Sequence, residues 1–348
     1  MTIKKKNLLS LDQFIEESLY NKKLGYYMKK DPFGGKGDFI TAPNISILFS
    51  EMIAIWIISF WESLKCPKKF NLIELGAGNG EMMRVMINTF KKFPIFKKAC
   101  NINILEKSTL LKKLQNKNIK DKDINWLKDI NTLNDFPSIF IANEFFDALP
   151  IKQFIKRRNN WYERHVKLNI LKDSEYLDIP FNMEKFEKKI KIKISYKQNF
   201  IEYSPLTMEY LKVITNKIKS NNGGILIIDY GYTDKILKNT LQAVSKHKYS
   251  NVLGVFGKSD ITYNLSFDLL DQIVKKLGSL CSLITNQKEF LMKLGIMERA
   301  EILTKNMPFI KKASVYFRLK RLIDKSQMGN LFKVMFITNK KNKFKVGF

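Results

Sequence analysis

The sequence has few of the residues that build disulfide frameworks and metal sites. Its three cysteines, Cys66, Cys100 and Cys281, are far apart and form no Cys-x-x-Cys pair. Its two histidines, His165 and His247, give little basis for a histidine-based triad or a multi-histidine metal site. We therefore expect no disulfide framework, no bound metal and a reducing compartment.

The sequence also lacks an apolar run long enough to form a membrane helix. The most apolar segment, residues 45–61, contains Glu51 and is shorter than the roughly 20 residues that span a bilayer. We expect a buried helix there and no membrane span. Ser10 and Gln13 fit a capping box that starts an amphipathic helix. This early start leaves little room for a transit peptide.

Acidic residues are scarce beside basic ones. The chain has 61 Lys and Arg against 33 Asp and Glu, a formal net charge of +28. Such an excess is typical of proteins that bind nucleic acid or membranes. The lysines are spread along the whole chain, however, and asparagine, isoleucine and phenylalanine are abundant too, as in proteins from AT-rich genomes. We interpret the lysines as a solvated coat and expect no nucleic-acid partner.

The most informative segment is residues 72–80, Leu-Ile-Glu-Leu-Gly-Ala-Gly-Asn-Gly. An apolar run that contains Glu74 is followed by Gly76, Gly78 and Gly80, and a helical apolar pattern begins at once after them. This order predicts a strand, a tight turn and a helix. Glycines are needed where the backbone adopts positive φ or approaches a ligand closely. The first such turn of a doubly wound sheet is where nucleotide-like ligands bind.

The motif lacks the third glycine of a dinucleotide-binding loop. In Gly-x-Gly-x-x-Gly counted from Gly76 the last position is Glu81, and counted from Gly78 it is Met83. A glutamate at the start of a helix would repel a pyrophosphate. The pattern Glu-x-Gly-x-Gly-x-Gly resembles instead motif I of S-adenosylmethionine (SAM) methyltransferases. SAM carries a sulfonium cation and no phosphate, so Glu81 is compatible with it. An ordinary glycine turn in an α/β protein is the alternative.

Strand and helix patterns alternate from residue 70 onward, which predicts an α/β fold with a parallel sheet and helical crossovers. The expected strands are residues 70–75, 101–106, 124–128, 139–143, 225–229, 280–285 and 333–338. We expect residues 1–69 to form an N-terminal helical cap and lid, and 70–348 to form the core. Insertions are expected at 151–222 and 287–330. The first should contain a β-hairpin around 155–166 with Asn159-Asn160 at its turn.

With these segments placed, the sequence resembles the MidA-like SAM-dependent methyltransferases. The main matching stretches are residues 25–27 (Gly-Tyr-Tyr), 31–43 (Asp-Pro-Phe-Gly-Gly-Lys-Gly-Asp-Phe-Ile-Thr-Ala-Pro), 74–80 (Glu-Leu-Gly-Ala-Gly-Asn-Gly), 106–108 (Glu-Lys-Ser), 142–150 (Ala-Asn-Glu-Phe-Phe-Asp-Ala-Leu-Pro), 229–231 (Asp-Tyr-Gly), 257–262 (Gly-Lys-Ser-Asp-Ile-Thr) and 328–333 (Met-Gly-Asn-Leu-Phe-Lys). The chain departs from the family at Tyr263-Asn264, where Ala-His is usual, and at Ala77 and Asn79, where Pro and Arg are frequent.

The resemblance implies a class I, Rossmann-like methyltransferase fold with a seven-stranded sheet whose last strand is antiparallel. It implies a protein arginine N-methyltransferase that uses SAM and acts on a subunit of respiratory complex I during assembly. The expected compartment is then the cytoplasm of a bacterium or the mitochondrial matrix of a eukaryote. The partner would be a protein with a target arginine, and a homodimer is kept as an alternative to a monomer. An RNA methyltransferase and a non-catalytic assembly chaperone on this scaffold are the competing functions.

Candidate SAM-binding residues follow the first three strands. Gly76, Gly78 and Gly80 would let the backbone wrap the methionine part, and Glu74 would hold either the loop or the amino group. Glu106, at the end of the second strand, can accept hydrogen bonds from ribose hydroxyls. Further candidates are Asp129 after the third strand, expected near the adenine amine, and Asp38 and Thr41 in a glycine-rich lid at 34–43.

Candidate catalytic residues leave the fourth strand: Asn143, Glu144 and Asp147. Methyl transfer needs mainly positioning, because the sulfonium already activates the carbon. A guanidinium can be held bidentately by carboxylates, so we expect Glu144 to be its main ligand and Asp147 to assist. Asp147 could equally be a turn residue. The sequence has no Asp/Asn-Pro-Pro-Tyr after this strand, which argues against N6-adenine and N5-glutamine methylation. Asp229, Tyr230 and Asp260 are expected along the far wall.

Overall fold

The computed structural model describes residues 8–29, 41–121, 123–169, 173–245, 248–254 and 256–348. Its centre is a mixed sheet that runs β15-β16-β10-β5-β2-β3-β4. The strands are β2 (Phe70–Leu75), β3 (Cys100–Leu105), β4 (Ile124–Leu127), β5 (Ser138–Asn143), β10 (Gly223–Tyr232), β15 (Leu280–Asn286) and β16 (Phe332–Asn339). All seven predicted strands are therefore confirmed. Strand β16 is antiparallel to both of its neighbours, as expected.

The sheet contains an eighth strand that the sequence analysis did not predict. The short β14 (Leu265–Ser266) pairs in parallel with the end of β10, so the expected count of seven was wrong by one. A two-residue strand has no periodicity that sequence patterns could reveal.

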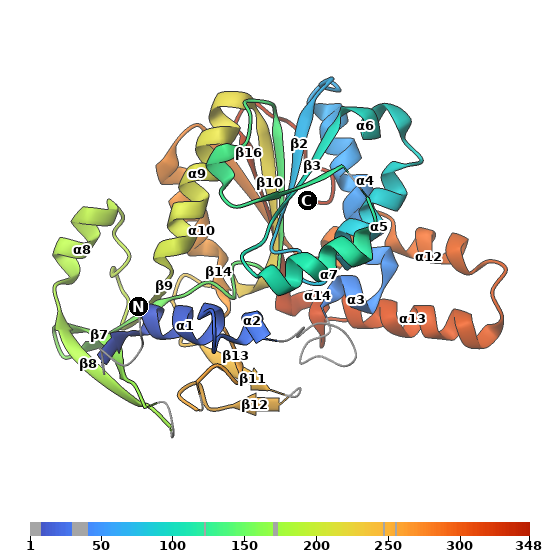
Figure 1. Cartoon of the computed structure of the whole chain (residues 1–348). Coiled ribbons are helices and arrows are strands. Elements are labelled where there is room, and N and C mark those ends of the chain that lie inside the picture. The colour runs from blue at the N-terminus through green and yellow to red at the C-terminus, as the bar shows by residue number, and fades with distance from the viewer. Residues whose placement is uncertain (1–7, 30–40, 122, 170–172, 246–247, 255) are drawn as a thin grey trace.

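Helices cover both faces of the sheet (Figure 1). One face carries α4 (Ile47–Ser63), α5 (Glu81–Phe90) and α6 (Pro94–Ala99), and the other carries α9 (Pro205–Asn221) and α10 (Phe267–Leu277). Residues alternate along each strand between the two cores. In β10, Ile225 and Ile227 pack in the core with α9 and α10, whereas Leu226 and Ile228 pack in the core with α4. A strand buried on both faces is typical of a parallel sheet covered by crossover helices.

The apolar segment around Glu51 forms the buried helix α4, as predicted. Its Glu51 carboxylate is paired with the guanidinium of Arg299, with Nε 2.9 Å from Oε2. Among the described residues, no helix is both long and apolar enough to cross a membrane.

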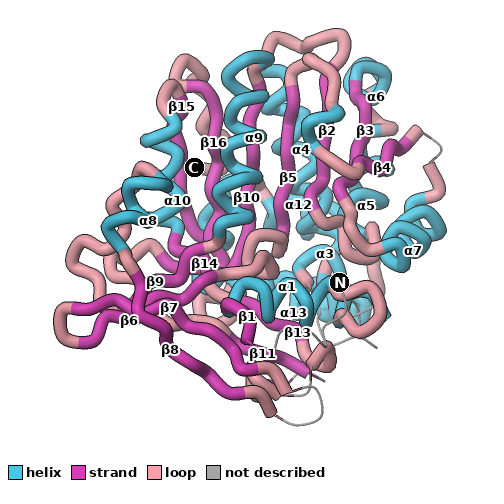
Figure 2. Tube along the Cα trace, turned by 60° about the vertical axis from the view of Figure 1, so that its left-hand side comes forward, coloured by secondary structure: helices cyan, strands magenta, loops and turns pink. Residues whose placement is uncertain are grey.

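A second sheet joins the N-terminal segment to the first insertion (Figure 2). It consists of β1 (Leu8–Ser10), β6 (Lys152–Arg157), β7 (Asn160–Lys167), β8 (Glu175–Phe181) and β9 (Phe200–Tyr203), with α8 (Met183–Ile190) between the last two. The predicted hairpin is β6–β7, but its turn is one residue earlier than expected. Arg157 pairs with Asn160, which leaves Arg158 and Asn159 at the turn, and Arg158 has a φ of 55°.

Three further parts complete the described chain. The helices α1 (Leu11–Tyr20), α2 (Tyr26–Lys29) and α3 (Ala42–Ile45) precede the core, and α7 (Thr109–Ile119) joins β3 to β4. A small sheet contains β11 (Gln242–Ser245), β12 (Lys248–Ser250) and β13 (Asp260–Thr262). The second insertion is helical, as predicted, with α11 (Gln287–Lys293), α12 (Ile296–Thr304), α13 (Phe309–Ile323) and α14 (Met328–Leu331).

Candidate active site

The turn between β2 and α5 has the positive-φ backbone that its glycines predicted. Gly76, Gly78 and Gly80 have φ values of 66°, 52° and 82°, in the left-handed region that favours glycine. A Cβ atom at Gly76 would lie 2.8 Å from a ring carbon of Phe145. Residues with side chains at these positions would therefore strain the turn or close the space beside it.

A cavity of about 530 Å³ lies beside this turn, at the carboxyl ends of β2, β3 and β5. We call it the glycine-lined cavity. Its walls are formed by Glu16, Tyr20, Tyr27, Gly76, Gly78, Leu105, Glu106, Lys107, Leu111, Lys128, Glu144, Phe145, Ala148, Leu149, Leu206 and Tyr210. Apolar and aromatic walls with a few polar groups are typical of a site for a small organic ligand. The sheet order reverses between β2 and β5, the point at which such sheets bind ligands.

The Glu106 carboxylate in this cavity is fixed by its neighbours. Its Oε1 accepts the N–H of Ser108 at 2.8 Å, and its Oε2 accepts the side-chain amide of Gln115 at 2.9 Å. The same amide nitrogen also donates to the carbonyl of Gly78 at 2.9 Å. Gln115 thus joins the acid after β3 to the glycine turn after β2. Gln115 was not predicted from the sequence, because a glutamine in a helix of mixed polarity carries no signal of its own.

Glu74 lies on β2, two residues before Gly76, and does not line the glycine-lined cavity. It is 2% exposed, and its Oε2 has no hydrogen-bond partner among the described residues. Burial, together with the nearby charge of Glu106, raises the pKa of Glu74 to about 8. The role of this acid in binding a ligand stays a prediction.

Three other predicted ligand residues differ in their placement. Asp129 lines neither cavity; its carboxylate caps the short helical turn Ile130–Thr132 by accepting the N–H of Asn131 at 2.9 Å. Thr41 lines the second cavity described below and not the glycine-lined one. Asp38 lies outside the described residues, as does most of the predicted lid.

Glu144 directly follows β5 and has an unusual backbone conformation. Glu144 has a φ of 50°, rare for a residue with a side chain, and its N–H donates to the carbonyl of Ile228 at 3.0 Å. Its Oε1 accepts the N–H of Ala42 at 3.4 Å and the side-chain amide of Asn143 at 3.3 Å. Burial raises the pKa of Glu144 to about 7 despite these two hydrogen bonds. Strain of this kind is typical of functional sites.

Asp229 fixes the turn that follows Glu144. Its Oδ2 accepts the N–H groups of Phe146 at 3.1 Å and Asp147 at 3.3 Å, and its Oδ1 accepts the N–H of Tyr230 at 2.9 Å. Asp229 is fully buried and does not line a cavity wall. The expectation that it lies along the far wall was therefore wrong. Burial and the charge of Asp229 raise the pKa of Asp147 well above its usual value, and the Asp147 Oδ1 atom has no partner among the described residues.

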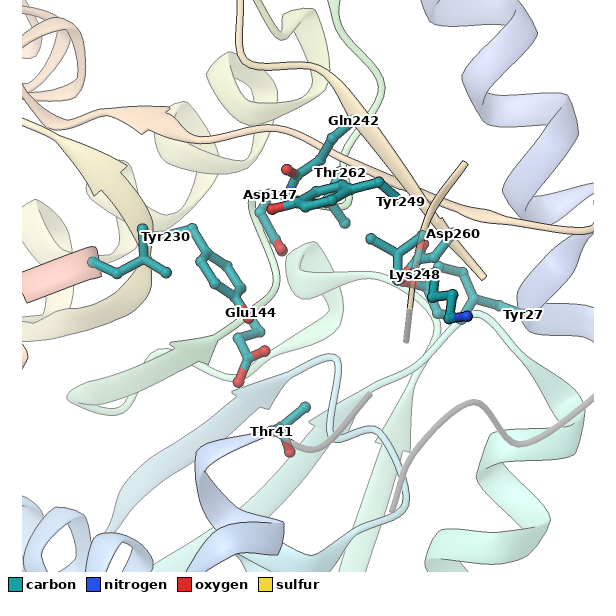
Figure 3. Close-up of a pocket in the computed structure, with 12 residues that line it drawn as sticks. Tyr27, Thr41, Glu144, Asp147, Tyr230, Gln242, Lys248, Tyr249, Asp260 and Thr262 are labelled. Atoms are coloured by element: carbon teal, nitrogen blue, oxygen red, sulfur yellow. Dashed lines mark hydrogen bonds between the residues drawn. The ribbon is translucent and has the colours of Figure 1, made fainter. Parts of the chain in front are cut away.

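A second cavity of about 340 Å³ opens beside these acids (Figure 3). We call it the carboxylate-lined cavity. Its walls are formed by Tyr27, Thr41, Glu144, Asp147, Tyr230, Gln242, Val244, Lys248, Tyr249, Asp260, Thr262 and Leu331. Three carboxylates from two distant parts of the chain, Glu144, Asp147 and Asp260, therefore border one space. The Tyr27 hydroxyl donates to Asp260 at 2.8 Å from Oδ2.

The two cavities share two wall residues, Tyr27 and Glu144. A ligand in the glycine-lined cavity would thus meet a ligand in the carboxylate-lined cavity at Glu144. Glu144 was predicted at this end of the sheet. Tyr27 was not given a role, because it stands in a matched motif without any chemical pattern around it. The arrangement can hold an uncharged or cationic organic molecule in the glycine-lined cavity next to a cationic group in the carboxylate-lined cavity. The first molecule can then donate a chemical group to the second.

Comparison with known proteins agrees with this geometry. Residues 52–284 match the family described as "Putative S-adenosyl-L-methionine-dependent methyltransferase". The chain is 28% identical to "Protein arginine methyltransferase NDUFAF7, mitochondrial" of Xenopus tropicalis, over 95% of this chain and 82% of that protein. It is 31% identical to the Caenorhabditis elegans homolog, over 79% and 70% of the two chains. The human protein is 27% identical over 95% and 80%.

A solved structure shows the same fold. The Burkholderia thailandensis protein crystallised with S-adenosyl-homocysteine superimposes with a TM-score of 0.81 and 20% identity, over 98% of this chain and 90% of that one. The native crystal structure of a COG1565 superfamily protein from the same organism superimposes with a TM-score of 0.77. The family match spans the glycine turn, the acids after β3 and β5, and most of the sheet. The chain belongs to the MidA-like family of S-adenosyl-L-methionine-dependent methyltransferases.

Proposed function

We propose that this enzyme methylates an arginine side chain of a protein, with SAM in the glycine-lined cavity and the guanidinium in the carboxylate-lined cavity. The observation that carries the proposal is the shared wall at Glu144 and Tyr27 between a cavity suited to SAM and a cavity bordered by three carboxylates. The relatives named as arginine methyltransferases support the same assignment.

The residues of the glycine-lined cavity fit SAM. The left-handed turn at Gly76 and Gly78 leaves the backbone open beside the space, and the Glu106 carboxylate retains lone pairs for the ribose diol. Tyr20, Tyr210 and Leu111 supply apolar walls for a purine. When bound, SAM supplies a methyl group on a positively charged sulfur. We assign its binding to the glycine turn and Glu106, with Glu74 before the turn as a support.

The carboxylate-lined cavity suits a guanidinium for an electrostatic reason. An arginine side chain has a pKa above 12 and enters as a planar cation with five N–H donors. Glu144 lies where the cavities meet, and Asp147 and Asp260 border the same space. Charge-assisted hydrogen bonds to these acids would hold the fork and leave one nitrogen aimed at the neighbouring cavity.

Glu144 can also take the proton that methylation releases. The guanidine nitrogen would attack the methyl carbon and form an N–C bond as the S–C bond of SAM breaks and S-adenosylhomocysteine leaves. The same nitrogen must give up an N–H proton, which passes to a base. Burial holds the pKa of Glu144 near 7, so its carboxylate is a stronger base than an exposed glutamate. A bound guanidinium would favour the ionised form before the transfer begins. We therefore assign Glu144 both roles and Asp147 the role of a second ligand.

The same acids argue against an RNA substrate. Glu144, Asp147 and Asp260 would repel a phosphate backbone that approached the carboxylate-lined cavity. They also argue against a non-catalytic chaperone, because binding a protein partner needs neither a SAM cavity nor three acids in the cavity next to it. We propose a complex I subunit as the substrate, following the family resemblance, and a mitochondrial compartment like that of the named relatives if the source is eukaryotic.

The proposal is tested by incubating the enzyme with tritiated SAM and protein extract from cells that lack it. We expect label in protein, resistant to ribonuclease, that elutes as methylated arginine after acid hydrolysis. Label in RNA, or in any amino acid other than arginine, would overturn the assignment. A reaction without enzyme gives the background transfer, and Glu144→Gln should label arginine more slowly than wild type.

A further inference from the structure

The second insertion carries an apolar tip that the methyltransferase chemistry does not use. Three side chains on α13 are largely exposed: Phe309 by 83%, Ile310 by 82% and Phe317 by 69%. Ile302, near the end of the neighbouring α12, is 68% exposed. In Figure 1 these two helices form a hairpin that projects from one side of the molecule. Exposed apolar groups gathered on a projection mark an interaction surface.

The helix α13 has buried apolar side chains on one side and exposed apolar side chains on the other. Leu319 and Leu322, in its second half, are buried against the body of the protein. At 3.6 residues per turn, Phe309, Ile310 and Phe317 fall on the side of the helix away from these leucines. Residues 309–314, in its first half, are all exposed. The first half therefore projects beyond the core with its apolar side chains facing solvent.

Basic residues dominate the charge around this tip. Residues 302–323 contain six basic residues and no acidic residue. The basic residues are Lys305, Lys311, Lys312, Arg318, Lys320 and Arg321. None of them forms an ion pair with another residue in the described ranges. The nearest acids along the chain are Glu301, on the preceding α12, and Asp324, directly after α13.

We propose that this tip docks on the surface of a membrane that contains anionic phospholipids, with Phe309 and Ile310 entering the interface. Paired apolar side chains flanked by lysines have the chemistry of an interfacial anchor: the apolar groups enter the headgroup boundary while the cations meet lipid phosphates. Two copies of α13 facing each other would bring their cations together, which disfavours a second copy as the occupant. The net charge of +28 adds attraction to the same surface.

Vesicle sedimentation tests the proposal with the full chain. Wild-type protein should bind phosphatidylcholine vesicles that contain phosphatidylglycerol, and should not bind phosphatidylcholine alone. Phe309→Ser/Ile310→Ser should weaken binding about tenfold or more, because two apolar groups no longer enter the interface. Lys311→Gln/Lys312→Gln should weaken binding and reduce its salt dependence. All of these side chains are exposed, so unfolding temperatures should not change.

Tyr196→Ser is the matched control. Tyr196 is 68% exposed and lies close to Lys197, in the loop after α8, and α8 lies far from α13 in Figure 1. Its loss should leave vesicle binding unchanged. Equal binding of the tip variant and wild type would overturn the proposal, as would equal binding to neutral vesicles. A wild-type dimer by light scattering that the Phe309→Ser/Ile310→Ser change converts to a monomer would assign the tip to a second copy instead.

Discussion

The Asp229 carboxylate on β10 accepts the backbone N–H of Asp147 at 3.3 Å and so fixes the turn after β5. The same oxygen accepts the N–H of Phe146 at 3.1 Å. These bonds make the turn that carries Glu144 and Asp147 dependent on a residue from a neighbouring strand. Asp229 touches neither cavity, so we regard it as a positioning residue.

Asp229→Asn should therefore lower kcat while leaving SAM affinity nearly unchanged. An amide has one oxygen in place of two, so at least one buried N–H loses its acceptor, at a cost of about 1–3 kcal/mol. We expect turnover to fall roughly tenfold or more as the two acids shift. Steady-state kinetics measures kcat, and calorimetry measures the SAM dissociation constant of the same variant. Loss of SAM binding with normal turnover at saturation would contradict the positioning role.

Glu144→Gln should slow turnover by roughly one to two orders of magnitude, since a charge-assisted hydrogen bond contributes about 1.5–3 kcal/mol. SAM affinity should hardly change. Glu106→Gln is the matched variant in the glycine-lined cavity. It should weaken SAM binding and affect turnover at saturating SAM much less. Calorimetry with single-turnover kinetics separates the two. If Glu144→Gln abolishes SAM binding and leaves transfer from a pre-bound complex intact, the roles of the two carboxylates are reversed.

The pH dependence of kcat/KM should follow the carboxylate of Glu144. Burial raises the pKa of this group to about 7, and its role requires the ionised form, so activity should rise with pH through about 7. In Glu144→Gln the remaining activity should lose this rise. A wild-type profile that stays flat between pH 6 and 8 would show that Glu144 does not act as the base.

The buried Glu74 should make stability fall as pH rises. Its pKa is about 8 in the folded protein against 4.5 for the ordinary group, so the folded state binds more protons between these values. The free energy of unfolding should then fall by up to about 1.4 kcal/mol per pH unit for this group. Glu74→Gln should be more stable than wild type at pH 8 and show a smaller pH slope. Urea unfolding at pH 5 and 8 measures both, and an unchanged slope would contradict the assignment.

The central sheet was largely predictable from the sequence because each strand carries its own signal. The runs 70–75 and 225–229 are mostly apolar. A strand in the core of a parallel sheet can therefore be recognised from its local sequence alone. The glycine turn was predictable for the same reason. The pairing of β1 with β7 was not, because Leu9 and Val166 meet across a long stretch of chain with no pattern to match them.

The candidate site was predictable only where residues leave strand ends. Glu106 and Glu144 follow strands whose carboxyl ends converge, so their proximity to one another followed from topology. Gln115 and Tyr27 reach the site from helices outside the sheet, and their contacts depend on tertiary packing. Asp129 satisfies the same strand-end rule, yet a local hydrogen bond to Asn131 occupies its carboxylate.

The most direct test of the central claim is mass spectrometry of methylated arginine in total protein from cells of the source organism. Three strains are compared: one with the wild-type protein, one without it and one with Glu144→Gln at the same level. We predict at least one arginine site that is methylated with the wild-type protein, unmethylated in the strain without it and methylated to a lower extent with Glu144→Gln. Identical arginine methylation in all three strains would contradict the assignment of this enzyme to arginine.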